Sequence, residues 1–121
     1  MISKELLSKV LGFECSSYKE LGGDDNIIYP LVHYGWVKGI EQISNAKQYP
    51  KGINIYELAH KCKEWALGKD FVLYSGSTHR TKKYRCDIYT KDGDVDEDFV
   101  SDTEPKAIFK ACEWIRTQIA S

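Results

Sequence analysis

Two stretches in the first half of the chain repeat apolar residues at the spacing of an amphipathic helix. In the first, Ser3 is placed to cap a helix and Gly12 suits the left-handed position that ends one, so we predict a helix within residues 1–12. Its apolar face comprises Leu6, Leu7, Val10 and Leu11. The second has Asn54 as cap, Glu57 three residues later as in a capping box, and Gly68 at its end. Its apolar face comprises Ile55, Leu58, Ala59, Cys62, Trp65 and Ala66.

The clearest helix start in the chain is Asp102-Thr103-Glu104-Pro105. Thr103 can cap, Glu104 is an acid in the first turn, and Pro105 stands where its missing N–H costs nothing. An apolar stripe then follows, formed by Ile108, Cys112, Ile115 and Ile119. We predict a third helix from Glu104 to about Ile119.

Three runs between the second and third helices have the patterns of strands. Phe71-Val72-Leu73-Tyr74 is apolar without alternation, which is typical of a strand covered on both faces. From Tyr84 to Tyr89 apolar and polar residues alternate, which predicts a strand with one open face. After the Asp92-Gly93 turn signal, a third strand is predicted over Val95–Val100, with Val95 and Phe99 on its inner side. Together these runs predict an antiparallel meander.

Residues 13–53 have no sustained period, because glycines and prolines interrupt it, and we predict an irregular segment there. Ile27–Val32 is its one strand-like run, and Pro30 limits that run to a sheet edge. The whole chain, 1–121, then reads as a single α+β domain, an α/β/α layered sandwich around a small antiparallel sheet. We expect the second and third helices on one face of the meander, and the first helix with the irregular segment over part of the other.

Composition is that of an ordinary globular domain, with 121 residues, 42% hydrophobic and 29% charged. The net charge of −1 argues against a protein whose main role is to bind a phosphate backbone. No apolar run approaches the length that a bilayer requires, and the opening residues lack the apolar core and cleavage site of a signal peptide. We therefore expect a cytoplasmic protein with no membrane partner.

Metal, cofactor and catalytic signatures are weak. The four cysteines, Cys15, Cys62, Cys86 and Cys112, form no C-x-x-C pair, so we expect buried free thiols. His60 and Cys62 are two apart on a helix and point in different directions. Asp92, Asp94, Asp96 and Asp98 alternate, but an EF-hand requires Gly and Glu where this chain has Glu97 and Thr103. We predict no metal, no cofactor and no enzymatic activity, and the alternating acids as the exposed face of a strand.

Three short sequence features follow one another along the chain and together resemble a known family. They are Val10-Leu11-Gly12-Phe13 after the first helix, the amphipathic middle helix that leads into an apolar strand, and Asp102-Thr103-x-Pro105-x-Ala107-Ile108. On these residues the chain resembles the phage ABA-sandwich domain family, with Cys15–Gly52 unmatched and Lys106 where members often carry Glu. The resemblance implies an α/β/α fold and a phage or prophage origin in a bacterial host, and it brings no catalytic residues.

Charge is split between two parts of the predicted meander. A basic segment, residues 79–85, contains Arg80, Lys82, Lys83 and Arg85, whereas residues 92–104 contain Asp92, Asp94, Asp96, Glu97, Asp98, Asp102 and Glu104. The two segments are either solvated loops that attract each other or a basic hairpin tip that meets an acidic partner or a phosphate. The order of helix, three strands and helix is also that of double-stranded RNA-binding domains, but the acidic start of the last helix repels phosphate.

Aromatic residues divide into two groups. Trp65 and Trp114 are predicted to be core and helix-packing residues. The other group lies in the irregular segment, where it forms either a contact surface or a lid on the sheet: Tyr29, His33, Tyr34, Trp36 and Tyr49.

The leading functional hypothesis is a small phage-type accessory protein, a non-enzymatic interaction module that binds a host macromolecule, in the first place a host protein, and blunts a defence system. Its predicted binding surface comprises Tyr34, Trp36, Arg80, Lys82, Lys83 and Arg85. The alternative is binding of nucleic acid or a nucleotide-like ligand by the same basic tip and aromatics. A hydrolase or transferase with a cysteine nucleophile is a third hypothesis, and it requires a reactive thiol.

Overall fold

The computed structural model describes residues 2–12, 15, 17–21, 27–31, 53–78, 83–90, 92–93 and 95–119. In chain order the elements are α1 (Lys4–Leu11), β1 (Ser17–Leu21), β2 (Ile27–Leu31), β3 (Ile53–Asn54), α3 (Ile55–Gly68), β4 (Phe71–Ser77), β5 (Tyr84–Thr90), β6 (Val95–Ser101) and α4 (Glu104–Ile119). The described chain thus combines three helices with two small antiparallel sheets, which confirms the predicted α+β class.

Local capping signals place the three helix starts where the sequence predicted them. The Leu6 N–H donates to Ser3 Oγ at 3.0 Å, and the Tyr56 N–H donates to Asn54 Oδ1 at 2.8 Å. At the start of α4 the Lys106 N–H donates to Thr103 Oγ1 at 3.3 Å. Each contact satisfies one N–H that has no partner inside its helix.

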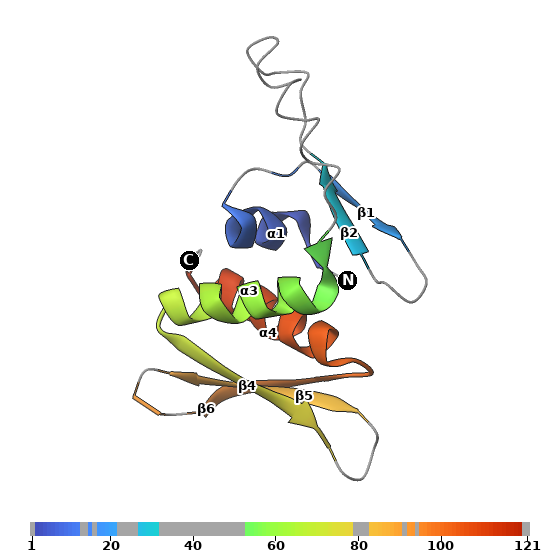
Figure 1. Ribbon diagram of the computed structural model, residues 1–121. Helices are drawn as coiled ribbons and strands as arrows, with labels where there is room; N and C mark the ends of the chain where they lie inside the picture. Colours follow the sequence, from blue (N-terminus) through green and yellow to red (C-terminus); the bar gives the residue numbers. More distant parts are fainter. Residues whose placement is uncertain are drawn as a thin grey trace.

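The larger sheet has the strand order β4-β5-β6, and α3 and α4 lie against one of its faces (Figure 1). Leu73, Cys86 and Ile88 are buried on the face that meets these helices. Arg85 is exposed and Asp87 and Tyr89 are half-buried, so the alternation along β5 gives the strand one covered and one open face, as predicted. Gly93 adopts φ 91° in the turn before β6, a conformation that favours glycine.

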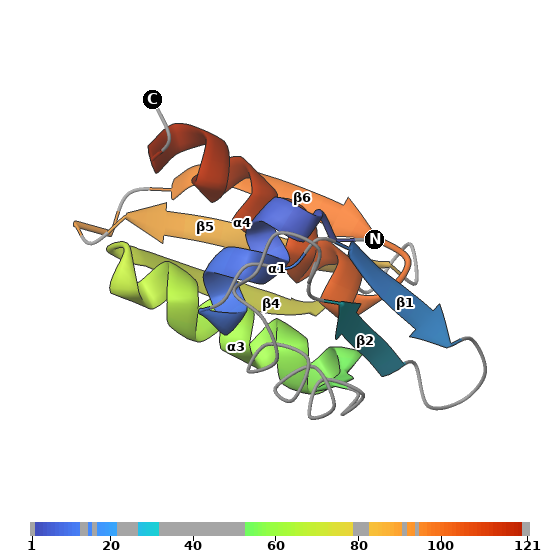
Figure 2. The same cartoon turned by 90° about the horizontal axis from the view of Figure 1, so that it is seen from above.

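The predicted position of α1 was wrong. Helix α1 packs on α3 and α4, on the side of these two helices that faces away from the β4-β5-β6 sheet (Figures 1 and 2). The other face of the β4-β5-β6 sheet therefore receives no cover from α1. Tyr74 makes the consequence visible, because it is 62% exposed although it belongs to the run predicted to be covered on both faces.

The smaller sheet has the order β1-β2-β3 and lies in the segment predicted to be irregular. The sequence analysis missed β1, and it placed Ile27–Val32 at an edge, whereas β2 lies between β1 and β3. Among the described residues, β3 pairs with Ile27 and Ile28, and Pro30 pairs with Tyr18 of β1.

One hydrophobic core joins these elements. Phe109 and Ile115 of α4, Leu58 of α3, Ile88 of β5 and Leu6 of α1 are fully buried in it. Trp65 and Trp114 pack against its border, and the Trp114 ring meets Phe71 edge-on at 6.2 Å, as expected for packing residues. Ile119, predicted on the apolar stripe, is 40% exposed at the end of α4.

Candidate functional site

The face of the β4-β5-β6 sheet turned away from α3 and α4 is the candidate site, and we call it the open face. No other element of the described chain lies over it (Figure 1). The strand register sets its residues in rows across the sheet: Val72 pairs with Tyr89; Tyr74 pairs with Asp87, which pairs with Asp98; and Gly76 pairs with Arg85, which pairs with Val100. The open face therefore has an apolar half, around Tyr74 and Tyr89, and a charged half, around Arg85.

The apolar half centres on two tyrosines of neighbouring strands. The Tyr74 and Tyr89 rings meet edge-to-face, with centroids 5.1 Å apart and an interplanar angle of 89°. Such a perpendicular pair is a favourable aromatic geometry, and it holds both rings in place. Together with Val72, Thr90 and Gly93 the pair lines an open hollow of about 470 Å³. Val100, on the far side of the face, is 42% exposed.

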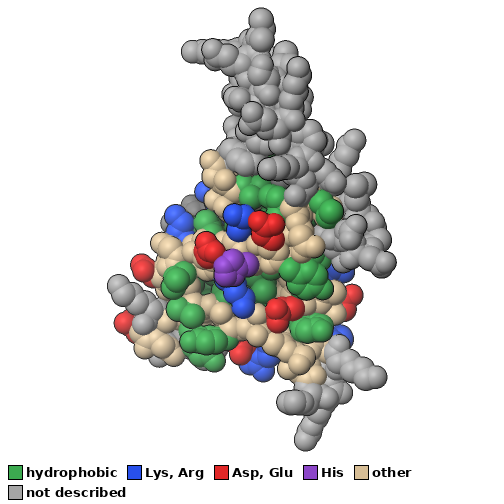
Figure 3. Space-filling view, in the orientation of Figure 1, with side chains coloured by type: hydrophobic (Ala, Val, Ile, Leu, Met, Phe, Trp, Pro, Cys, Tyr) green, Lys and Arg blue, Asp and Glu red, His purple; other side chains and the backbone are tan. Residues whose placement is uncertain are grey.

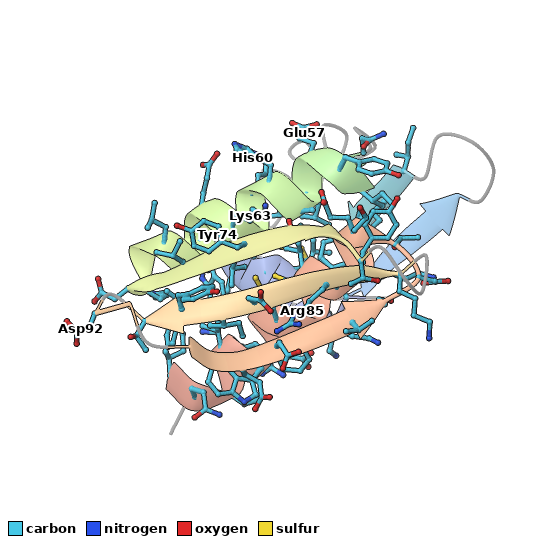
Figure 4. All side chains as sticks on the ribbon, turned by 90° about the horizontal axis from the view of Figure 1, so that it is seen from below. Glu57, His60, Lys63, Tyr74, Arg85 and Asp92 are labelled. Atoms are coloured by element: carbon cyan, nitrogen blue, oxygen red, sulfur yellow. The ribbon has the colours of Figure 1, made fainter. Side chains whose placement is uncertain are left out.

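The charged half is a cluster of three side chains around Arg85, and Figure 4 shows Arg85 and Tyr74 from the open side of the sheet. Arg85 Nε donates to Asp87 Oδ1 at 2.5 Å and lies 3.5 Å from Asp98 Oδ2. The hydrogen bond with Asp87 and the negative charges of both carboxylates raise the pKa of the Arg85 guanidinium. Because two carboxylates face one guanidinium, the cluster has a net negative charge.

This cluster changes the meaning of the basic segment in the sequence. Arg85 was predicted to belong to a basic binding tip, yet it lies on the open face between two acids. Lys83 is exposed just before β5, where its carbonyl accepts from the Thr78 N–H at 2.8 Å. Tyr34, Trp36, Arg80 and Lys82 lie outside the described residues. Of the six predicted binding residues, the described part of the chain thus includes Lys83 and Arg85. Arg85 lies on the open face between two acids, whereas Lys83 is an exposed residue just before β5.

Sequence reasoning missed Tyr74, Tyr89, Val100, Asp87 and Asp98 as residues of a site. The alternation along β5 does predict that Arg85, Asp87 and Tyr89 share a face. The unbroken apolar run of β4 concealed Tyr74, because such a run predicts cover on both sides.

The thiols lie away from the open face, inside the core. Cys15, Cys62, Cys86 and Cys112 are all buried thiols, as predicted. Burial raises the pKa of Cys86 to about 12 and also raises the pKa of Cys15. The Cys112 thiol donates to the Cys62 carbonyl at 3.5 Å, and the contact with Cys62 and burial raise its pKa as well. Thiols in such surroundings are poor nucleophiles.

Acidic and histidine side chains are dispersed. His60 is exposed and pairs with Glu64 at 2.8 Å, whereas Cys62 points into the core. Within the part of the chain that the structure describes, no three His, Cys, Asp or Glu side chains form a group that could hold a metal ion. None of the described helices combines the length and apolar character needed to cross a membrane.

Comparison with known proteins found no similar protein: no family model matches the chain, and no curated protein or solved structure matches it. The resemblance to the phage ABA-sandwich domain family stays a prediction.

Proposed function

We propose that this chain is a non-enzymatic binding module that contacts a partner protein through the open face. The observation that carries the proposal is the exposure of Tyr74, at 62%, beside Tyr89 on an uncovered sheet face. Tyrosine is one of the residues that dominate binding energy at protein interfaces, because a rigid ring buries a large area at low entropic cost. The resemblance to phage proteins suggests a host macromolecule as the partner, with inhibition of a host defence as the outcome.

The mixed character of the open face also suits a protein partner. An apolar centre formed by Val72, Tyr74 and Tyr89 next to the Arg85 cluster resembles the anatomy of an interface, in which an apolar core has a polar rim. Arg85 is held by Asp87 and Asp98 and so is positioned in advance for a partner's polar groups.

Nucleic-acid binding is the alternative function, and the open face does not favour it. A phosphate that approaches Arg85 also meets Asp87 and Asp98, whose charges repel it. The remaining described cation of the basic segment is Lys83. Retention of labelled RNA or DNA that weakens steeply with salt would support this alternative against the proposal.

The test compares Tyr74→Ala with a matched tyrosine on another surface. Tyr56 of α3 is 59% exposed, so Tyr56→Ala removes a ring of similar exposure away from the sheet. Wild-type protein and both variants are used to capture partners from a bacterial host lysate, and retained protein and nucleic acid are both identified.

We expect Tyr74→Ala to weaken binding of the captured protein by about tenfold or more, and Tyr56→Ala to leave it unchanged. Both variants should stay folded, because neither ring is part of the core, and Tyr74→Ala should unfold only a few degrees below wild type through loss of the contact with Tyr89. Equal retention by Tyr74→Ala and wild type would exclude the open face as the binding surface.

A further inference from the structure

The two edge strands of the β4-β5-β6 sheet differ in how they are protected against pairing with another strand. β6 carries the exposed acids Glu97 and Asp98 and has a register shift opposite Ile88 and Tyr89. Charges and bulges of this kind are how native sheets prevent a further strand from adding. The seven residues of β4, Phe71–Ser77, contain no charge and no proline, and their register with β5 is regular.

The outer edge of β4 thus lacks the charges and the register shift that β6 carries. Among the described residues the only strand neighbour of β4 is β5. In an antiparallel ladder every second residue of an edge strand directs its N–H and C=O groups away from its neighbour. These groups require hydrogen bonds from water or from another backbone.

A groove runs along this same edge. α3 lies beside the outer edge of β4, as Figure 4 shows from the open side of the sheet, with His60 and Lys63 on the helix near Tyr74 on the strand. Between helix and strand is a hollow of about 220 Å³, lined by His60, Lys63, Glu64, Leu67, Val72 and Leu73. Leu67 is 61% exposed at this hollow, a large apolar side chain that the core does not use. Figure 3 shows this side of the molecule, where apolar and charged side chains intermix over α3.

We propose that the groove between α3 and β4 is a second binding site, which takes an extended, uncharged segment of a partner protein as a fourth strand of the sheet. The β4 backbone supplies the hydrogen bonds, and the hollow beside Leu67 takes an apolar side chain of the segment. This is the recognition mode in which backbone pairing provides affinity and a side-chain pocket provides selectivity.

Charge on the helix wall agrees with an uncharged segment. Glu64 pairs with His60 at 2.8 Å, and Lys63 is half-buried beside them. Acidic and basic side chains both line the helix side of the groove, so neither positive nor negative charge dominates there. A charged side chain seated against Leu67 and Leu73 would have to lose water next to two apolar groups, so this part of the hollow favours an uncharged residue.

A second copy of the chain fits this edge less well than a single strand does. A copy paired through its own β4 would bring its own α3 to the same edge, and the two helices would compete for the space beside the strands. An extended segment has no such helix.

The test begins with selection of ten-residue peptides from a random displayed library on the wild-type protein, and the best clone is then synthesised as the probe. Its affinity is measured for wild type, for Leu67→Glu, and for Lys61→Glu as an exposed control on the same helix that does not line the groove. Amide hydrogen exchange with and without the peptide reports which strand becomes protected.

We expect selected peptides with uncharged β-branched residues at alternate positions, a loss of at least about tenfold in affinity for Leu67→Glu, and little change for Lys61→Glu. The amides of β4 should exchange more slowly in the complex. Peptides that bind equally well to Leu67→Glu, or that protect no β4 amide, would overturn the proposal. So would a wild-type dimer that Leu67→Glu converts to a monomer, because a second copy would then occupy the edge.

The variant Val100→Glu distinguishes the groove from the open face. Val100 is an exposed residue of the open face and lies on β6, the edge strand farthest from the groove. If Val100→Glu abolishes binding of the peptide while Leu67→Glu leaves it intact, the groove proposal fails and the open-face proposal stands. If the lysate partner is lost with Leu67→Glu and retained with Tyr74→Ala, the open-face proposal fails and the groove stands.

Discussion

At the scale of single residues, the surroundings of a charge decide what it can do. Asp87 and Asp98 accept contacts from Arg85 on the open face, so this guanidinium does not add to a basic patch. Asp102 is a second example, since it precedes α4 and lies 3.5 Å from the Lys106 ammonium. That positive charge is the main reason that the pKa of Asp102 is lowered below its ordinary value of 3.8.

Asp102 therefore links stability to pH. A carboxyl group whose pKa is lower in the folded state stabilises the fold above its unfolded pKa, and that contribution disappears as pH falls through the folded pKa. We expect Asp102→Asn to lower the melting temperature slightly near neutral pH, and this difference to shrink below pH 3.8 and disappear as the pH falls through the lowered pKa of Asp102 in the folded state. Melting curves of both proteins across this pH range measure the difference.

The Lys106→Ala background is the control for this effect. Without the ammonium, Asp102→Asn should produce a clearly smaller pH-dependent difference, since the main cause of the lowered pKa is gone and the hydrogen bond from Ser101 remains. A difference of unchanged size in that background would show that Lys106 is not the cause.

At the scale of elements, a single carboxylate joins the first and last helices. Glu113 of α4 accepts from the Ser3 N–H and from the Ser3 hydroxyl, each at 2.8 Å, and Arg116 Nε donates to it at 3.2 Å. Ser3 in turn caps α1 through the Leu6 N–H. The contact orders the start of a helix that is only eight residues long and that needs tertiary contacts to persist.

Glu113→Ala should consequently destabilise the protein. It removes the acceptor for two hydrogen bonds from Ser3, and a hydrogen bond to a charged group contributes about 1.5–3 kcal/mol net of water, less where the group is partly exposed, as Glu113 is. We expect the free energy of unfolding, measured by urea titration, to fall by about 1–3 kcal/mol. Glu64→Ala, at an exposed carboxylate of α3, should change it by no more than about 0.5 kcal/mol. Equal losses in the two variants would show that Glu113 does not hold α1.

At the scale of the whole molecule, two layers of helices lie on one side of the β4-β5-β6 sheet, and among the described elements none covers its other side (Figure 1). The core that this arrangement creates contains the thiols of Cys62, Cys86 and Cys112, which come from α3, β5 and α4. Their protection depends on the packing of all three elements together.

Thiol labelling measures that packing. Because burial both shields the cysteines and raises the pKa of Cys15 and Cys86, we expect slow alkylation of native protein and fast alkylation of all four thiols in urea. If labelling requires global unfolding, a stability of 5 kcal/mol or more slows it by about a thousandfold or more. Mass spectrometry at intervals identifies each labelled cysteine. A single cysteine that reacts at its unfolded rate would revive the cysteine-nucleophile hypothesis.

Much of the fold was predictable because its signals are local. The caps Ser3, Asn54 and Thr103 make hydrogen bonds within a few residues, so their effect does not depend on the rest of the chain. The alternation along β5 likewise results from strand geometry alone. The candidate site was less predictable, since it depends on which face of the sheet is left uncovered and on which strands are neighbours.

The sequence by itself therefore determined the helices, the meander and the α+β class, because caps, turns and periodicity act over short distances. Only the tertiary structure decided that α1 packs on helices instead of on the sheet, that Tyr74 is exposed, and that Arg85 lies between two acids. Each of these facts depends on contacts between residues distant in sequence or on different strands. An apolar run indicates that burial of its side chains would lower the free energy, and the packing of the whole chain decides which of those side chains are buried.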